Sequence, residues 1–98
     1  MTTVQFTPEF VLAAANAAMT KASNATNELY RLMEIGYLNS QTGLDTAKEI
    51  KKHLMTAYEL LDKVNIPEAK VNQALIGHSI GHSIARQDMI IRNIELSM

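Results

Sequence analysis

The spacing of apolar residues constrains the fold of this sequence more than any other feature. Through three long segments these residues recur every three or four positions, which places them along one face of an α-helix. The series in the first segment is Val11, Ala15, Ala18, Ala22, Ala25, Leu29, Leu32 and Gly36. No segment shows the apolar–polar alternation that is typical of a half-buried strand. The sequence therefore predicts an all-α protein.

Capping and turn residues mark where the predicted helices begin and end. Thr7 can cap the first helix, Pro8 fits its first turn, and Gly36 suits the left-handed position that follows a helix. A polar linker separates the first two helices, and Asn65 with Pro67 separates the last two. The predicted helices cover residues 8–35, 42–64 and 67–95.

Short links between long helices favour an antiparallel up-down-up three-helix bundle, with long first and third helices and a shorter second helix. The two long helices would each extend about 40 Å at 1.5 Å per residue. A compact globule of 98 residues would be only ~30 Å across. We therefore expect one rod-like helical domain that spans residues 1–98.

The composition excludes several classes of protein. The chain has a net charge of −1 and contains no Cys and no Trp. The lack of Cys excludes disulfide scaffolds, thiol catalysis and thiolate metal sites, and the lack of a basic surplus argues against nucleic-acid binding. The first residues carry no Lys or Arg to begin a signal peptide, and the apolar stretch at residues 10–19 is too short to span a bilayer. We expect a cytoplasmic protein with no nucleic-acid partner, no membrane partner and no cofactor.

Two columns of small residues predict a close approach between helices. The first predicted helix contributes Ala15, Ala18 and Ala22, and the third contributes Gly77 and Gly81. Two glycines inside a helix cost about 2 kcal/mol relative to alanine, so a packing contact should offset them. Three arrangements fit this requirement: the columns pack together within one chain, they meet between two chains, or a ligand approaches the backbone there.

The third predicted helix carries more apolar residues than one small bundle needs, because Ile76, Ile80 and Ile84 lie beside a second apolar column. Homo-oligomerisation, most simply as a twofold dimer, would cover this excess. Docking of a different protein is the alternative. The predicted interface residues are Ala15, Ala18, Ala22, Gly77, Ile80, Gly81, Ile84, Met89 and Ile91.

The tetrapeptide Ile-Gly-His-Ser occurs twice in tandem over residues 76–83 and places His78 and His82 four residues apart. On a helix this spacing puts both imidazoles on one face, where they can chelate a transition metal. The alternative is that both imidazoles form hydrogen bonds with neighbouring hydroxyls or with another helix. A nucleophile pair of Ser79 and His82 is disfavoured because a helix interior offers no oxyanion donors. We therefore expect no enzymatic activity.

Lys48, Lys51 and Lys52 form a basic cluster in the second predicted helix. Such a cluster is usually a solvated face. The alternative is a site for a small anion such as a nucleotide phosphate, because arginine gives bidentate phosphate contacts and tyrosine offers a face for a base. The predicted anion-binding residues are Tyr30, Arg31, Lys48, Lys51, Lys52 and Arg86.

These features support three hypotheses about function. The first is a small non-enzymatic binding protein that acts as a homo-oligomer through protein–protein contacts, by occlusion or scaffolding. The second is an inhibitor of the kind a phage or mobile element would use, which sequesters a small anionic ligand such as a signalling nucleotide at an oligomer interface. The third is a metal-binding protein that uses the His78–His82 pair.

Overall fold

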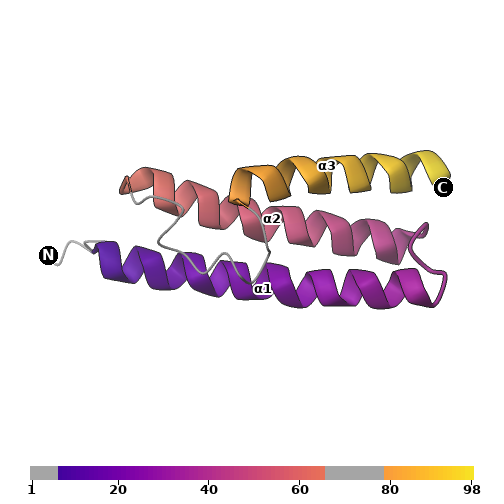
Figure 1. The fold of residues 1–98 in the computed structure, drawn as a ribbon, viewed down its shortest axis with the longest axis horizontal. Coiled ribbons are helices and arrows are strands. Elements are labelled where there is room, and N and C mark those ends of the chain that lie inside the picture. Colours follow the sequence, from indigo (N-terminus) through magenta and orange to yellow (C-terminus); the bar gives the residue numbers. More distant parts are fainter. Residues whose placement is uncertain (1–6, 66–78) are drawn as a thin grey trace, which may run out of the picture.

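A computed structural model describes residues 7–65 and 79–98 of the chain. It contains three α-helices, α1 (Pro8–Glu34), α2 (Gln41–Lys63) and α3 (Ile80–Ser97), and the described residues form no strand (Figure 1). The prediction of an all-α fold is confirmed. Neither α1, α2 nor α3 has a stretch long and apolar enough to cross a lipid bilayer.

Local hydrogen bonds fix both ends of α1. At its start the Thr7 hydroxyl accepts a hydrogen bond of 3.1 Å from the backbone N–H of Phe10. At its end Gly36 has a φ of 82°, and the N–H of Tyr37 donates to the carbonyl of Leu32 at 2.8 Å. This is the Schellman ending, which glycine permits because it has no Cβ to oppose a positive φ.

The turn between α1 and α2 depends on Ser40 and Gly43. The Ser40 hydroxyl donates to the carbonyl of Tyr37 at 2.6 Å and accepts from the N–H of Gly43 at 3.2 Å, so it caps α2. A Cβ built on Gly43 would lie 1.9 Å from the carbonyl oxygen of Leu38. Only glycine therefore lets the first turn of α2 pack this closely against the preceding loop.

The start of α3 differs from the prediction. Ser79 has extended backbone, with φ −61° and ψ 153°, and its hydroxyl accepts from the N–H of His82 at 3.2 Å. The predicted continuous helix over 67–95 is therefore wrong at Ser79, because this residue has extended backbone and caps the helix that follows it. Positions 67–78 of that prediction lie outside the described residues.

The three helices lie side by side, with α2 between α1 and α3 (Figure 1). Packing of α1 on α2 and of α2 on α3 buries one apolar core, and the molecule measures 50 × 30 × 19 Å. The most deeply buried large side chains come from all three helices and are Met19, Leu54, Ile80 and Ile94. Because α3 packs mainly along α2, a hollow remains between α1 and α3.

Candidate functional site

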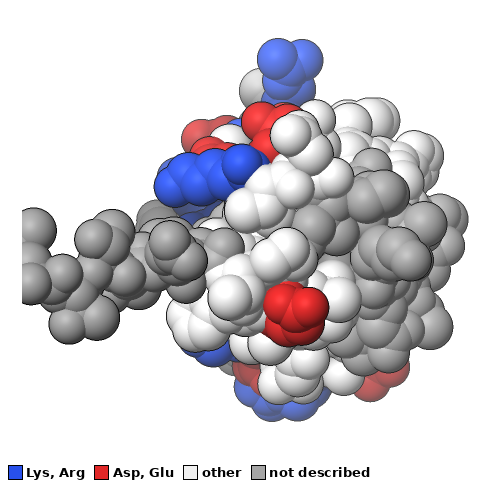
Figure 2. Space-filling model, turned by 90° about the vertical axis from the view of Figure 1, so that its left-hand side faces the viewer, with Lys and Arg blue, Asp and Glu red and all other residues white. Residues whose placement is uncertain are grey.

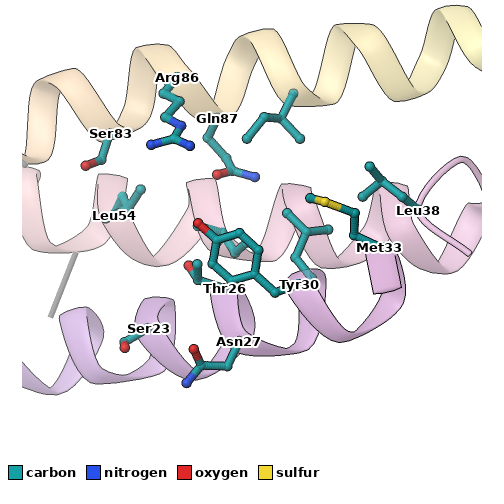
Figure 3. Close-up of a pocket in the computed structure, with 13 residues that line it drawn as sticks. Ser23, Thr26, Asn27, Tyr30, Met33, Leu38, Leu54, Ser83, Arg86 and Gln87 are labelled. Atoms are coloured by element: carbon teal, nitrogen blue, oxygen red, sulfur yellow. The ribbon is translucent and has the colours of Figure 1, made fainter. Parts of the chain in front are cut away.

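A cavity of about 300 Å³ lies between α1 and α3, with α2 as its floor (Figure 3). This volume is at the lower end of the range for small-molecule sites. Its apolar lining consists of Leu29, Met33, Leu38, Ile50, Leu54 and Ile90. Its polar lining consists of Ser23, Thr26, Asn27, Tyr30, Ser83, Arg86 and Gln87.

The sequence of α3 explains which side chains reach the cavity. Each residue turns an α-helix by about 100°, so Ser83, Arg86, Gln87 and Ile90 share the flank of α3 that faces α1. On the α1 side the hydroxyl of Thr26 donates to the carbonyl of its own helix at Ala22 at 2.8 Å. The small and polar side chains on this side of α1 therefore leave the cavity between α1 and α3 open, whereas large apolar side chains would fill it.

Gln87 is the most unusual residue of the cavity. Its side chain is buried, with only 6% of the residue exposed, and its Nε2 atom has no hydrogen-bond partner among the described residues. An unmade buried hydrogen bond costs about 1–3 kcal/mol, so native proteins rarely leave such a donor alone. A ligand or an ordered water in the adjoining cavity would satisfy this donor.

Two further groups converge on the same space. Figure 3 shows the Arg86 guanidinium and the Gln87 amide extending from α3 toward α1, while the Tyr30 ring extends from α1 toward α3. Tyr30 is 50% exposed, and among the described residues no carboxylate forms an ion pair with Arg86. The cavity thus combines a free cation, a buried neutral donor and an aromatic ring.

The structure divides the six predicted anion-binding residues. It brings Tyr30 and Arg86 to one cavity, but Lys51 forms an ion pair of 2.6 Å with Asp88. Asp88 projects from the opposite flank of α3 to Arg86, because two residues turn the helix by about 200°. Lys48 and Lys52 are exposed and do not line the cavity. Within one chain the lysine cluster therefore does not share the cavity with Arg86 and Tyr30, and a joint site at an interface between chains stays a prediction.

Arg31 is also held away from the cavity. Its Nε and Nη2 atoms donate to the Glu28 carboxylate at 3.0 and 2.5 Å. These hydrogen bonds lower the pKa of Glu28 below its ordinary value and raise the pKa of Arg31. On the end of the molecule drawn in Figure 2, Lys and Arg atoms are interspersed with Asp and Glu atoms, so no extended basic patch forms on that face.

Most of the predicted interface residues are unavailable to a second chain. Ala15, Ala18, Ala22 and Ile80 are buried in the core of the chain itself. The alanine column therefore serves close packing within the molecule. Gly81 is exposed, and a Cβ added there would meet no atom within 4 Å, so no described helix of the same chain approaches this position closely.

The rest of that predicted interface lies on α3 or outside the described residues. Ile84 and Ile91 are half-buried against the core, whereas Met89 is 67% exposed. Gly77 lies outside the described residues. Met89 is therefore the residue of the set that most clearly presents an apolar side chain to solvent.

Only one member of the predicted histidine pair is described. His78 lies outside the described residues, whereas His82 lies in the first turn of α3, where its backbone N–H donates to the Ser79 hydroxyl at 3.2 Å. His53, the histidine of α2, lies 3.4 Å from the Glu49 carboxylate. Within residues 7–65 and 79–98 no group of three His, Cys, Asp or Glu side chains is arranged to hold a metal ion.

The sequence analysis missed Gln87, although one signal pointed to it. Ile80, Gln87 and Ile94 are spaced seven residues apart, so an amide occupies the middle of an otherwise apolar core line. No family model matches the chain, and comparison with curated proteins and with solved structures finds no similar protein, so its function has to be inferred from the cavity itself.

Proposed function

We propose that this protein is a non-enzymatic binding protein that holds a small anionic ligand in the cavity between α1 and α3. The observation that carries the proposal is the buried Nε2 donor of Gln87 beside the guanidinium of Arg86, neither of which has a partner among the described residues. An acceptor on the ligand would satisfy Gln87, and its negative charge would form charge-assisted hydrogen bonds with Arg86.

The chemistry of the lining supports binding rather than turnover. The described residues that line the cavity include no His, Asp, Glu, Lys or Cys. Proton transfer near neutral pH relies mainly on such groups. The protein would act by lowering the free concentration of its ligand, a role that suits a phage or mobile element facing a host signal.

Native mass spectrometry of gently purified protein tests this proposal directly. We expect an adduct of a few hundred daltons on the wild-type chain, as for a ligand of nucleotide size, and its loss from Arg86→Gln and Gln87→Met. Lys52→Gln removes one positive charge outside the cavity, and Gln41→Met makes the amide change at an exposed position, so both should retain the adduct. Wild-type protein without an adduct, and without thermal stabilisation by an anion panel, would contradict the proposal.

A second candidate function is self-association, and a different observation supports it. Met89 is 67% exposed and Leu96 is 80% exposed, and both lie with Ala85 on the outer side of α3. In an antiparallel twofold pairing of two α3 helices, Met89 of one copy faces Leu96 of the other. The same register brings Arg92 of one copy near Glu95 of the other, so the charges beside the apolar contact are complementary.

We infer from this register that two copies would form one larger antiparallel helical bundle, with each α3 at the centre. This arrangement fits the expected up-down-up order of the helices and would cover the outer side of α3. The dimer leaves the cavity of each copy on the flank of α3 that carries Arg86, about a quarter-turn from the paired surface. Self-association and ligand binding are therefore compatible in one protein.

A further inference from the structure

The depth of each polar group in the cavity gives the orientation of a ligand. Gln87 is 6% exposed, whereas Tyr30 is 50% exposed and Arg86 belongs to the exposed residues. A neutral donor therefore lies at the inner end and a cation at the mouth. Burying a charge without a paired charge is far more costly than burying a neutral acceptor. The ligand should place an uncharged acceptor inside and its anionic group near solvent.

From this arrangement, and resting on the proposed function, we infer that the ligand is a nucleotide, with its base against Gln87 and its phosphate at Arg86. A nucleobase has acceptor atoms on its edge and two apolar faces, which matches a single amide donor surrounded by aliphatic side chains. Glutamine amides recognise base edges, and arginine forks bind phosphate oxygens bidentately. The exposed ring of Tyr30 offers a stacking surface at the rim.

Two simpler anions fit the same cavity less well. A fatty acid could place its carboxylate at Arg86, but its acyl chain would leave Nε2 of Gln87 without an acceptor. Inorganic phosphate could bind Arg86 alone, but it would leave the apolar floor around Leu54 and Ile90 unfilled. A base joined to a phosphate satisfies the donor, the cation and the apolar lining together.

The test compares adenosine monophosphate, adenosine, inorganic phosphate and decanoate by calorimetric titration. We expect the nucleotide to bind at least tenfold more tightly than each of the other three. Arg86→Gln should reduce nucleotide affinity to that of adenosine. Gln87→Met should weaken the nucleotide and adenosine about tenfold and leave phosphate binding unchanged. Lys52→Gln and Gln41→Met, which lie outside the cavity, should behave as wild type.

The absorbance of any retained molecule gives an independent readout. Because the chain contains no Trp and three Tyr, a bound nucleobase would be conspicuous in its ultraviolet spectrum. Tightest binding of decanoate, or a retained adduct without base absorbance, would overturn the nucleotide inference and leave the proposed small-anion function standing. Failure of all four compounds, together with a bare native mass, would overturn both. If the nucleotide inference holds, titrations with the guanine, cytosine and uracil nucleoside monophosphates would rank the affinities for the different bases.

Discussion

At the scale of single residues, Gln87 is the position where stability and binding oppose each other. It lies between Ile80 and Ile94 on the buried line of α3, both of them in the core. An amide at such a position weakens the ligand-free protein, because its Nε2 donor exchanges water for no partner. A residue of this kind is typical of a binding site that sacrifices some stability for function.

Replacing Gln87 by methionine should therefore stabilise the ligand-free protein. The unbranched methionine has a similar shape and needs no hydrogen bond, so we expect the free energy of unfolding to rise by about 1 kcal/mol. Urea denaturation of ligand-free protein measures this change. Gln41→Met removes an exposed hydrogen bond of 2.8 Å to Asp45, so this control should lower the free energy of unfolding by no more than about 0.5 kcal/mol. A less stable Gln87→Met would mean that the amide has a partner in the native state.

Glu28 and Arg31 give a second prediction at this scale, concerning pH. Hydrogen bonds from Arg31 hold the pKa of Glu28 below its ordinary value, so the carboxylate favours the folded state. Its stabilising contribution is present above the pKa of the unfolded chain and is lost as the pH falls through the lower pKa of the folded protein. In Arg31→Gln the pKa of Glu28 should return toward its ordinary value, which a carboxyl-carbon NMR titration measures.

A second variant is the control for this titration. Lys63→Gln removes a positive charge at the end of α2, which does not contribute to the shift of Glu28, so the pKa of Glu28 should stay as low in this variant as in wild type. An unchanged Glu28 pKa in Arg31→Gln would show that the Arg31 contact does not persist in solution.

At the scale of helices, two glycines should respond oppositely to the same substitution. In Gly43→Ala the new methyl group would collide with the Leu38 carbonyl, so we expect a loss of about 1–3 kcal/mol. In Gly81→Ala the methyl group would meet no neighbour, and the greater helix propensity of alanine should stabilise α3 by about 0.5 kcal/mol. Thermal denaturation of both variants checks the signs. If Gly81→Ala were destabilised instead, a neighbouring group would have to lie close to that glycine, as the sequence predicted.

The bounds of α1 and α2 were predictable from the sequence, whereas the start of α3 was not. The spans of α1 and α2 lie within one residue of the predicted ranges, because Thr7, Pro8 and Gly36 are unambiguous signals of helix ends. The start of α3 was missed because the tandem repeat keeps a helical period across Ser79. A serine within such a period can lie inside a helix or cap a new one, and tertiary packing decides between them.

The candidate site was predictable only in part, for a related reason. Arg86 and Tyr30, which were singled out by their chemistry, line one cavity, whereas the lysines grouped with them do not line it. Neighbours in sequence diverge by about 100° per residue on a helix, so a basic cluster need not share a surface. Gln87 could be identified only once the buried side of α3 was known. A glutamine indicates a binding site only when its amide is buried and has no partner among the described residues.

At the scale of the whole molecule, the order of packing determines which surfaces remain open. Helix α2 is packed on both sides, whereas α3 is packed against α2 and presents its outer side to solvent (Figure 1). A helix at the edge of such a layer exposes apolar side chains on its outer side, as α3 exposes Met89 and Leu96. Pairing with the outer side of α3 of a second copy is the simplest way to cover them, because a twofold axis lets the same patch form both halves of the interface.

We therefore expect a dimer in solution, with a mass of about twice the 10.9 kDa of one chain. The double variant Met89→Glu, Leu96→Glu should be monomeric, because the twofold pairing would bring its new carboxylates together and remove the apolar contact. Met55→Glu introduces the same charge at an exposed methionine of α2 and should remain dimeric. Light scattering over a concentration series measures these masses. A monomeric wild-type chain, or a dimer that survives the double variant, would exclude the outer side of α3 as the interface.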